Sequence, residues 1–574
     1  MQRSSLWCLF VLATLGVPCA SAQSLKPGTA VDIVIRDGKL VDGSGSPWQY
    51  GDLAIQGSRI VGMGKLPKLD ARRTIDAKGL IVAPGFIDMH SHSEYLLLED
   101  GRGESKIRQG VTTEVFGESD SPGPHLGKFI PPQRKVRGRT ERWTTLGEYF
   151  DLAEKEGIAP NVVSHVGLGN VWKCVMGTSA QRPTPAQLDE MKELIDQAMK
   201  QGARGLSCCL AMPPDGLATT DDLVELCKVV AKHGGIFVVH VRHEGTEVLA
   251  AFREVIEIAR RAGVRVEILH IKIADQKYWG KMNEMIRLID DARRGGLDIG
   301  ANVYPYTRGN NNLSSIIPPW AHEGGTAALL ERMKNPKTRV RLKKEIEGGV
   351  PGWYNHYTAV GGDWSRMLVN AEGSYKGLTM DRILDQRAAG KTPTPDPLDE
   401  FLDLLSEVGG SLSTIFDHHT EKDMNLAMVQ PWCSIGSDGL AYAIAGPLRR
   451  DQPHPRSFGT FPRVLGRYVR ELKILSLEEA VRKMTSLNAG KLGIYDRGLL
   501  RPGLSADVVI FDADKVIDKS SYENPFQYPE GIEYVIVNGQ VVLDRGTHTG
   551  ALPGRVLRGP GYRGDAKAAE PQGK

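Results

Sequence analysis

The sequence is poor in cysteine, in net charge and in long apolar stretches. Its 574 residues include seven cysteines, without a CxxC pair or the spacing of a disulfide framework, which argues against a fold held by disulfides. The net charge is only +3 and no run of Lys or Arg stands out, which argues against nucleic acid or an anionic membrane surface as the main partner. Beyond the first residues, no segment is long and apolar enough to span a membrane. The remaining composition, 41% apolar and 25% charged, is typical of a large soluble protein.

Residues 1–22 have the pattern of a secretory signal. Arg3 supplies the positive charge, Leu6 to Val17 supply the apolar stretch, and Ala20-Ser21-Ala22 form a small-residue cleavage site before Gln23. A membrane anchor is the alternative, but the apolar stretch falls short of the ~20 residues that a spanning helix needs. The sequence therefore predicts an exported protein with a cleaved signal, periplasmic if the source is Gram-negative.

Two β-rich segments lie at opposite ends of the mature chain. Both alternate apolar and polar residues at period two, and the second contains a hairpin-turn signal at Asn538-Gly539. We therefore expect one small β-sandwich domain assembled from residues 23–83 and 485–558. The final residues 559–574 are polar and rich in small residues, and we expect them to be disordered.

Residues 84–484 alternate short apolar strands with amphipathic helices. The strand candidates are 85–90, 112–117, 161–167, 205–210, 236–241, 266–271, 300–306 and 434–439. Helices such as 219–234 and 245–263 open on a Thr or Gly cap and close on Gly, as helices in βα units often do. Repeated βα units predict an α/β fold with a TIM-type (β/α)₈ barrel. Residues 320–412 break this rhythm, and we interpret them as an insertion that could act as a lid.

The strongest local signal for chemistry is the run Asp88-Met89-His90-Ser91-His92. Residues two apart on a strand face the same side, so both imidazoles should point into the barrel at its C-terminal mouth. Two neutral histidines placed in this way can hold one divalent cation.

Three further strand ends carry side chains of the same kind, namely His240, His270 and Asp438. A single strand-end histidine is more simply a satisfied core residue, but barrel interiors prefer branched aliphatic side chains. Four histidines and an aspartate at strand ends therefore predict a metal centre. A divalent cation lowers the pKa of bound water from about 15.7 to about 7, so this centre indicates a hydrolase.

Longer stretches carry a family signature. They are PGFIDMHSH at 84–92, HPRSFGTFPR at 454–463 and TGALPGRVLR at 549–558. In these stretches the chain resembles the amidohydrolase superfamily and, within it, the N-acyl-D-amino-acid deacylases (D-aminoacylases), along nearly all its mature length. The resemblance implies metal-dependent hydrolysis of a linear amide and a small-molecule substrate, an N-acyl amino acid. The preference for the D enantiomer comes from the resemblance alone.

The same resemblance implies roles for individual residues. The metal ligands that it implies are His90, His92, His240, His270 and Asp438. Asp438 would also be the catalytic base, which takes the proton of water and passes it to the leaving amine. Lys272 and either Tyr304 or Tyr306 would lie beside the substrate and help to stabilise the oxyanion. Without the resemblance, Lys272 could equally be a solvated rim residue and the tyrosines ordinary barrel packing.

The sequence departs from the D-aminoacylase pattern at one position. Family members carry an Asn-Cys-Gly step whose cysteine ligates the metal, whereas this chain has Glu118-Ser119-Asp120. We expect Glu118 to replace the thiolate, because a carboxylate can bridge two cations or complete one site. The alternative is a loop carboxylate beside a single site of histidines and Asp438. We expect one or two Zn²⁺ ions, and a hard oxygen in place of sulfur should ease the entry of Mn²⁺ or Co²⁺.

The carboxylate of an amino-acid substrate needs a cationic partner, and a planar guanidinium binds it through two hydrogen bonds. The candidates are Arg242, Arg456 and Arg463, with His454 nearby. Each could instead be an ordinary helix-cap or ion-pair residue, and for Arg463 we prefer that interpretation.

Three other functions are alternatives to deacylation. A dipeptidase would use the same chemistry. A cyclic-amide hydrolase of the dihydroorotase or hydantoinase kind usually needs a carboxylated lysine, but Glu118 or the region of His165 stands at the matching strand ends. A non-catalytic binding protein of the same fold is expected to lose ligands or Asp438, and here all are present.

Overall fold

The computed structural model describes residues 25–564. The secretory signal expected for residues 1–22 and the last residues, 565–574, lie outside this range. Within it, no helix has the length and apolar character to cross a bilayer. Residues 559–564, which we expected in a disordered tail, lie against the barrel instead. The Gly559 N–H donates to the Gly202 carbonyl (2.8 Å).

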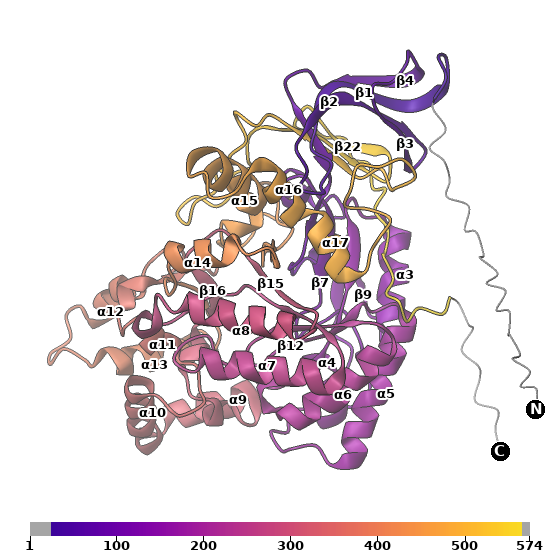
Figure 1. The fold of residues 1–574 in the computed structure, drawn as a ribbon. Helices are drawn as coiled ribbons and strands as arrows, with labels where there is room; N and C mark the ends of the chain where they lie inside the picture. Colours follow the sequence, from indigo (N-terminus) through magenta and orange to yellow (C-terminus); the bar gives the residue numbers. More distant parts are fainter. Residues whose placement is uncertain (1–24, 565–574) are drawn as a thin grey trace, which may run out of the picture.

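Eight parallel strands form the barrel at the centre of the molecule (Figure 1). They are β6 (Phe86–Asp88), β7 (Val111–Phe116), β10 (Asn161–Ser164) continued by β11 (Val166–Gly167), β12 (Gly205–Cys209), β13 (Ile236–His240), β14 (Arg265–Ile268), β15 (Ile299–Val303) and β19 (Cys433–Ile435). Pairing runs β6-β7-β10 and β11-β12-β13-β14-β15-β19, and a bridge from Ser91 to Gly439 joins the last strand to the first. All eight strands overlap the predicted runs, and the barrel is confirmed.

Helices pack around the strands (Figure 1). Those of the barrel are α1 (Leu96–Glu99), α2 (Glu104–Ile107), α3 (Leu146–Glu156), α4 (Leu168–Met176), α5 (Pro185–Gln201), η1 (Asp215–Leu217), α6 (Thr220–Lys232), α7 (Val248–Ala262), η2 (Gln276–Tyr278), α8 (Met282–Arg294), α14 (Glu421–Met428), α15 (Arg456–Arg463), η6 (Val464–Glu471), α16 (Leu477–Met484) and α17 (Ser486–Leu492). A β8 (Arg134–Val136) and β9 (Arg139–Glu141) hairpin precedes α3. Capping boxes at Thr184 and Thr219 begin α5 and α6.

The start of α7 differs from the prediction. Its N-cap is Glu247, not the expected Gly245. The ring of His243 accepts the backbone N–H groups of both residues (3.0 Å from Gly245 and 3.3 Å from Glu247), so a turn closed by a side chain precedes the helix. The C-terminal end follows the prediction, because Gly263 adopts the left-handed conformation (φ 65°).

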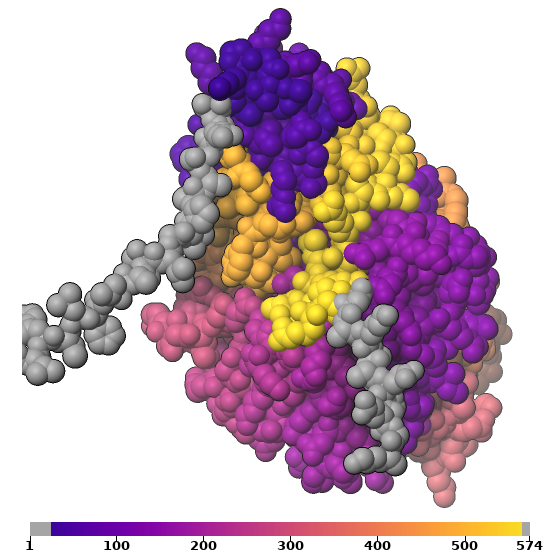
Figure 2. Space-filling view, turned by 90° about the vertical axis from the view of Figure 1, so that its right-hand side faces the viewer, coloured from indigo at the N-terminus to yellow at the C-terminus, as the bar shows by residue number. Residues whose placement is uncertain are grey.

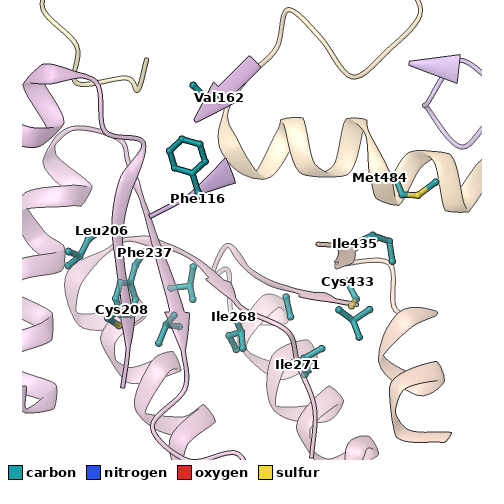
Figure 3. Close-up of a cluster of buried hydrophobic side chains, with 14 of the residues drawn as sticks. Phe116, Val162, Leu206, Cys208, Phe237, Ile268, Ile271, Cys433, Ile435 and Met484 are labelled. Carbon is teal, nitrogen blue, oxygen red and sulfur yellow. The ribbon is translucent and has the colours of Figure 1, made fainter. Parts of the chain in front are cut away.

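Alternation along β13 explains how an apolar strand delivers a polar side chain to the mouth. Phe237 and Val239 belong to the main core, whereas Ile236 and Val238 form a separate cluster on the other face. His240 continues the face of Ile236 and Val238. Figure 3 shows the main core, where side chains of β7, β12, β13, β14 and β19 gather.

A β domain at one end of the molecule is built from both ends of the chain. Its strands are β1 (Ala30–Leu40), β2 (Gln49–Gln56), β3 (Arg59–Gly64), β4 (Asp70–Asp76), β5 (Ile81–Pro84), β20 (Val508–Phe511), β21 (Ile532–Val537), β22 (Gln540–Asp544) and β23 (Thr547–His548). Antiparallel pairing of β5 with β20 joins the two segments, which lie side by side in Figure 2. The predicted hairpin turn is confirmed, with positive φ at Asn538 (48°) and Gly539 (79°).

The chain between β15 and β19 forms a unit with a core of its own, here called the inserted segment (residues 309–416). Its elements are β16 (Gly309–Asn312), η3 (Leu313–Ile316), η4 (Pro319–His322), α9 (Gly325–Lys334), α10 (Pro336–Gly348), α11 (His356–Ala359), η5 (Trp364–Arg366), β17 (Met367–Val369), α12 (Met380–Ala388), α13 (Pro397–Glu407) and β18 (Ser413–Phe416). It is wider than the expected 320–412, because β16 and β18 pair with each other and close the unit.

A buried network around one ion pair links the first barrel strand to the segment after the last. The Lys106 Nζ atom lies 2.7 Å from Asp88 Oδ2, and both side chains are fully buried. The same ammonium donates to Ser437 Oγ (2.7 Å) and to the Gly439 carbonyl (3.1 Å). Asp88 in turn accepts the backbone N–H of Ser437 (2.7 Å). This network, the strand clamp, holds the chain after β6 against the chain after β19.

Replacement of Lys106 by Met should lower the free energy of unfolding by about 3–5 kcal/mol, because Asp88 would remain as a buried charge without a partner. The double variant Lys106→Met/Asp88→Asn should recover part of this loss. Denaturant unfolding of the metal-free protein, followed by circular dichroism, measures both effects. Wild-type stability in the single variant would contradict a role for the strand clamp.

Candidate metal centre

The side chains of His90, His92, Glu118 and Asp438 meet beyond the C-terminal ends of β6, β7 and β19. Each offers one ligand atom, and these atoms all lie within 4.8 Å of one another. The shortest separations are 2.6 Å between His90 Nε2 and Glu118 Oε2, and 3.0 Å between His92 Nε2 and Asp438 Oδ1.

A second group adjoins the first. Glu118, His240 and His270 also offer ligand atoms within 4.8 Å of one another, so Glu118 belongs to both groups. The structure therefore brings all six predicted metal ligands to one place. A shared carboxylate with a ligand group on either side has the arrangement of a two-cation centre.

The backbone is strained at two of these ligands. His270 (φ 35°) and Asp438 (φ 51°) adopt the left-handed conformation, which is uncommon for residues other than glycine. The Asn302 side chain accepts the His270 N–H (2.9 Å), and the His90 carbonyl accepts the Asp438 N–H (2.7 Å). These two hydrogen bonds stabilise the left-handed backbone conformation, which the two residues would rarely adopt without them.

The two carboxylates are kept as anions by their neighbours. Burial raises the pKa of Glu118, but the charge of His90 and hydrogen bonds from His240 and His90 outweigh it and hold that pKa well below its usual range. Burial also raises the pKa of Asp438, but the Arg456 guanidinium, 2.7 Å from Asp438 Oδ2, the charge of His90 and a hydrogen bond from His92 together outweigh it, so this pKa too lies well below its usual range.

The chemistry of the donor set fits a divalent cation. Imidazole nitrogen and carboxylate oxygen are both ligands that zinc accepts in proteins, beside the cysteine thiolate. Burial lowers the pKa of His92, but the hydrogen bond and charge of Asp438 and the charge of Glu118 outweigh it and raise this pKa to about 9. The two carboxylates thus favour a positive charge at His92, here the charge of the protonated ring. A divalent cation bound at this place would displace that proton.

Glu244 lies behind the second ligand group. Its Oε1 atom is 3.4 Å from His240 Nε2 and 3.4 Å from His270 Nδ1, and it forms an ion pair with Lys272. The Lys272 ammonium also lies 2.9 Å from His270 Nδ1. Carboxylates commonly orient metal-ligating histidines in this way. Glu244 was not predicted from the sequence, and its signal is its place four residues after His240, within His243-Glu244-Gly245.

A cavity of about 400 Å³ opens over the ligands. Lys272, Tyr304 and Arg456 line it, and the Arg456 guanidinium lies 4.9 Å from the centre of the Tyr304 ring. The inserted segment and the loop after it contribute Gly309, Asn310, Asn311, His356 and His418. None of these was predicted as a site residue, and only His356 lies within the expected insertion, 320–412.

The structure does not bring Arg242 to the cavity, and this corrects its expected role as a substrate ligand. Its guanidinium pairs with Glu254 (2.9 Å) and donates to the carbonyl groups of Gly216 (2.7 Å) and Ala218 (2.8 Å). These contacts occupy the N–H groups of the guanidinium and hold the loop after β12 in place.

Tyr306 and His454 also lie outside the cavity lining. The Tyr306 hydroxyl donates to Asp518 (3.2 Å), which is also the ion-pair partner of Arg463 (3.0 Å). Of the two candidate tyrosines, only Tyr304 lines the cavity. His454 accepts the backbone N–H of Arg456 (3.1 Å) and so supports that arginine from behind.

The five cysteines in the described part of the chain are all free. Four are buried, as expected for small apolar residues, and they are Cys174, Cys208, Cys227 and Cys433. Cys209 is only partly buried, and it lines the cavity.

The sequence of this chain is similar to a known protein family and to proteins of known activity. The amidohydrolase family matches residues 73–281 and 354–543. A D-aminoacylase of Alcaligenes xylosoxydans xylosoxydans is 32% identical over 531 residues, which cover 92% of this chain and 97% of that protein. An N-acyl-D-glutamate deacylase of the same organism is 33% identical, with 92% and 96% covered.

A solved structure agrees with these matches. The N-acyl-D-glutamate deacylase of Bordetella bronchiseptica, complexed with zinc and a phosphonate inhibitor that mimics the tetrahedral intermediate, has a TM-score of 0.75 to this chain. The two are 29% identical, and the match covers 92% of this chain and 100% of that one.

Replacement of Glu118 by Ala should lower both the zinc content and the activity, because both ligand groups lose their shared oxygen. We expect at least a tenfold weaker affinity for zinc, measured by mass spectrometry of the metal after equilibrium dialysis. Asp120→Ala removes a neighbouring carboxylate that is half exposed (51%) and should keep wild-type zinc. Unchanged zinc content in Glu118→Ala would refute the shared-ligand assignment.

Proposed function

The chain belongs to the amidohydrolase family, and from this premise we propose that it is a metal-dependent N-acyl-D-amino-acid deacylase. It hydrolyses a linear amide to a carboxylate and a free D-amino acid. The observation that carries the proposal is the convergence of six potential metal ligands and a guanidinium at one cavity. The relatives support the substrate class.

The metal ligands would be His90, His92, Glu118, His240, His270 and Asp438. A bound divalent cation supplies Lewis-acid chemistry, since it lowers the pKa of water from about 15.7 to about 7 and polarises a carbonyl. Asp438 is the general base. Its Oδ1 atom faces His92 and its Oδ2 atom faces Arg456, at the wall of the cavity. It takes one proton from the attacking water as the C–O bond forms, and it gives that proton to the nitrogen as the C–N bond breaks.

Arg456 binds the carboxylate of the amino acid. Its guanidinium lines the cavity, where a second carboxylate can share it with Asp438. Tyr304 donates a hydrogen bond to the oxyanion. Burial raises the pKa of Tyr304, so its hydroxyl keeps its proton, and this side chain lines the cavity. Lys272 adds a positive charge beside the site, held in place by Glu244.

Two variants should separate these roles. Asp438→Asn should lower kcat at least 100-fold with a small change in KM, because only proton transfer and one ligand are affected. Arg456→Lys should raise KM at least tenfold with a smaller change in kcat, because an ammonium cannot form the two parallel hydrogen bonds of a guanidinium. Steady-state kinetics at constant zinc occupancy measures both. Near-normal kcat in Asp438→Asn would end its assignment as the base.

A substrate panel tests the reaction itself. The zinc-loaded protein should hydrolyse N-acetyl-D-methionine at least 100-fold faster than the L enantiomer, and it should leave a dihydropyrimidine and an L,L-dipeptide intact. Release of the free amine is the measurement, and removal of zinc with a chelator should abolish it. Turnover of the dihydropyrimidine alone would support the cyclic-amide alternative and contradict the proposal.

We propose also that the protein is exported, to the periplasm if the source is Gram-negative. The support is the N-terminal sequence, with Arg3, the apolar run from Leu6 to Val17 and the small residues before Gln23. When the full chain is produced in a Gram-negative host, the periplasmic fraction should contain a protein that begins at Gln23. A cytoplasmic protein that retains Met1 would contradict export.

A further inference from the structure

A second and larger hollow adjoins the catalytic cavity. It measures about 820 Å³, within the range of small-molecule pockets. We call it the outer groove, and its apolar lining comprises Phe129, Ala180, Met212, Pro213, Leu217 and Trp320. It lies between barrel loops and the inserted segment, which contributes Trp320. Met212 lines both the outer groove and the catalytic cavity, so this side chain stands at the border of the two spaces.

The order of the strands sets the direction in which a substrate would lie. Met212 follows β12, and Asp438 follows β19. Around the barrel these strands are four places apart in a circle of eight, so Met212 and Asp438 stand on opposite walls. Arg456 contacts Asp438 and belongs to the same wall. An amino-acid carboxylate on Arg456, with its amide among the metal ligands, therefore directs the acyl group toward Met212 and the outer groove.

The charged residues of the outer groove do not make it an anion site. Lys173 lies 3.8 Å from Asp120, and its ammonium lies 5.2 Å from the centre of the Phe129 ring. The other two charged residues of the lining, Lys128 and Glu323, are exposed. Lysine stems cover apolar surface while their charges stay in water. The groove therefore suits an aliphatic chain whose far end reaches solvent.

We propose that the outer groove binds the acyl chain of the substrate, and that the enzyme prefers N-acyl-D-amino acids with medium-length or long straight acyl chains. This inference rests on the proposed function, because it assigns the acyl side of the same catalytic site. On its way from the catalytic cavity to the outer groove, the acyl group passes the Met212 side chain.

A chain-length series tests the preference. For N-acetyl-, N-hexanoyl- and N-decanoyl-D-methionine, kcat/KM of the zinc-loaded wild type should rise at least tenfold from acetyl to decanoyl, since each buried methylene can add up to about fourfold. Ala180→Trp, which fills the outer groove, should remove this rise. Leu217→Trp should act likewise. Ala388→Trp, at a half-buried alanine of α12 outside the groove, should behave as wild type.

Binding of decanoate, measured by calorimetry, gives a readout without catalysis. Wild type and Ala388→Trp should bind it at least tenfold more tightly than Ala180→Trp. Equal kcat/KM for acetyl and decanoyl substrates, or an undiminished rise in Ala180→Trp, would overturn the inference. If no N-acyl substrate reacts while decanoate binding still depends on Ala180, the proposed function fails and the groove assignment stands.

Discussion

The candidate site depends on closure of the barrel between its first and last strands. The strand clamp of Lys106, Asp88 and Ser437 lies beneath the mouth, and above it the backbone joins the same two segments. The His92 N–H donates to the Gly439 carbonyl (3.0 Å), and the Asp438 N–H donates to the His90 carbonyl (2.7 Å). A buried ion pair adds little net stability, but a network with every partner in place favours one arrangement over its neighbours. Here that arrangement brings the histidine pair to the aspartate.

Glu118 gives the centre its particular character. It is the one side chain common to both ligand groups, and its neighbours hold it as an anion despite burial. Where the D-aminoacylase pattern places a soft sulfur, this chain has a hard oxygen, which is consistent with Mn²⁺ or Co²⁺ as well as zinc. Glu244 stands behind His240 and His270, so carboxylates lie on both sides of the second ligand group.

The sequence predicted the features that local pattern controls. Apolar runs located the eight barrel strands, and polar residues at their ends located the candidate metal ligands. Features that depend on distant contacts were missed or wrong. Arg242 lies only two residues after the strand-end residue His240, but its guanidinium forms an ion pair with Glu254 on α7. Tyr304 and Tyr306 could not be separated, since the chain leaves strand geometry after Val303 and only the fold shows which ring faces the cavity. His356 belongs to an insertion without the barrel's rhythm.

The inserted segment thus does more than cover the barrel, because it completes the polar wall of the catalytic cavity and one side of the outer groove. The proposed metal centre nevertheless depends above all on the shared carboxylate of Glu118 at the mouth of the barrel. Anomalous diffraction at the zinc edge, from crystals of the zinc-loaded protein, tests it most directly. We predict zinc with a Glu118 oxygen at about 2.0–2.2 Å and with histidines of at least one ligand group in the same shell. Zinc bound elsewhere, or a Glu118 side chain turned away from it, would contradict the account.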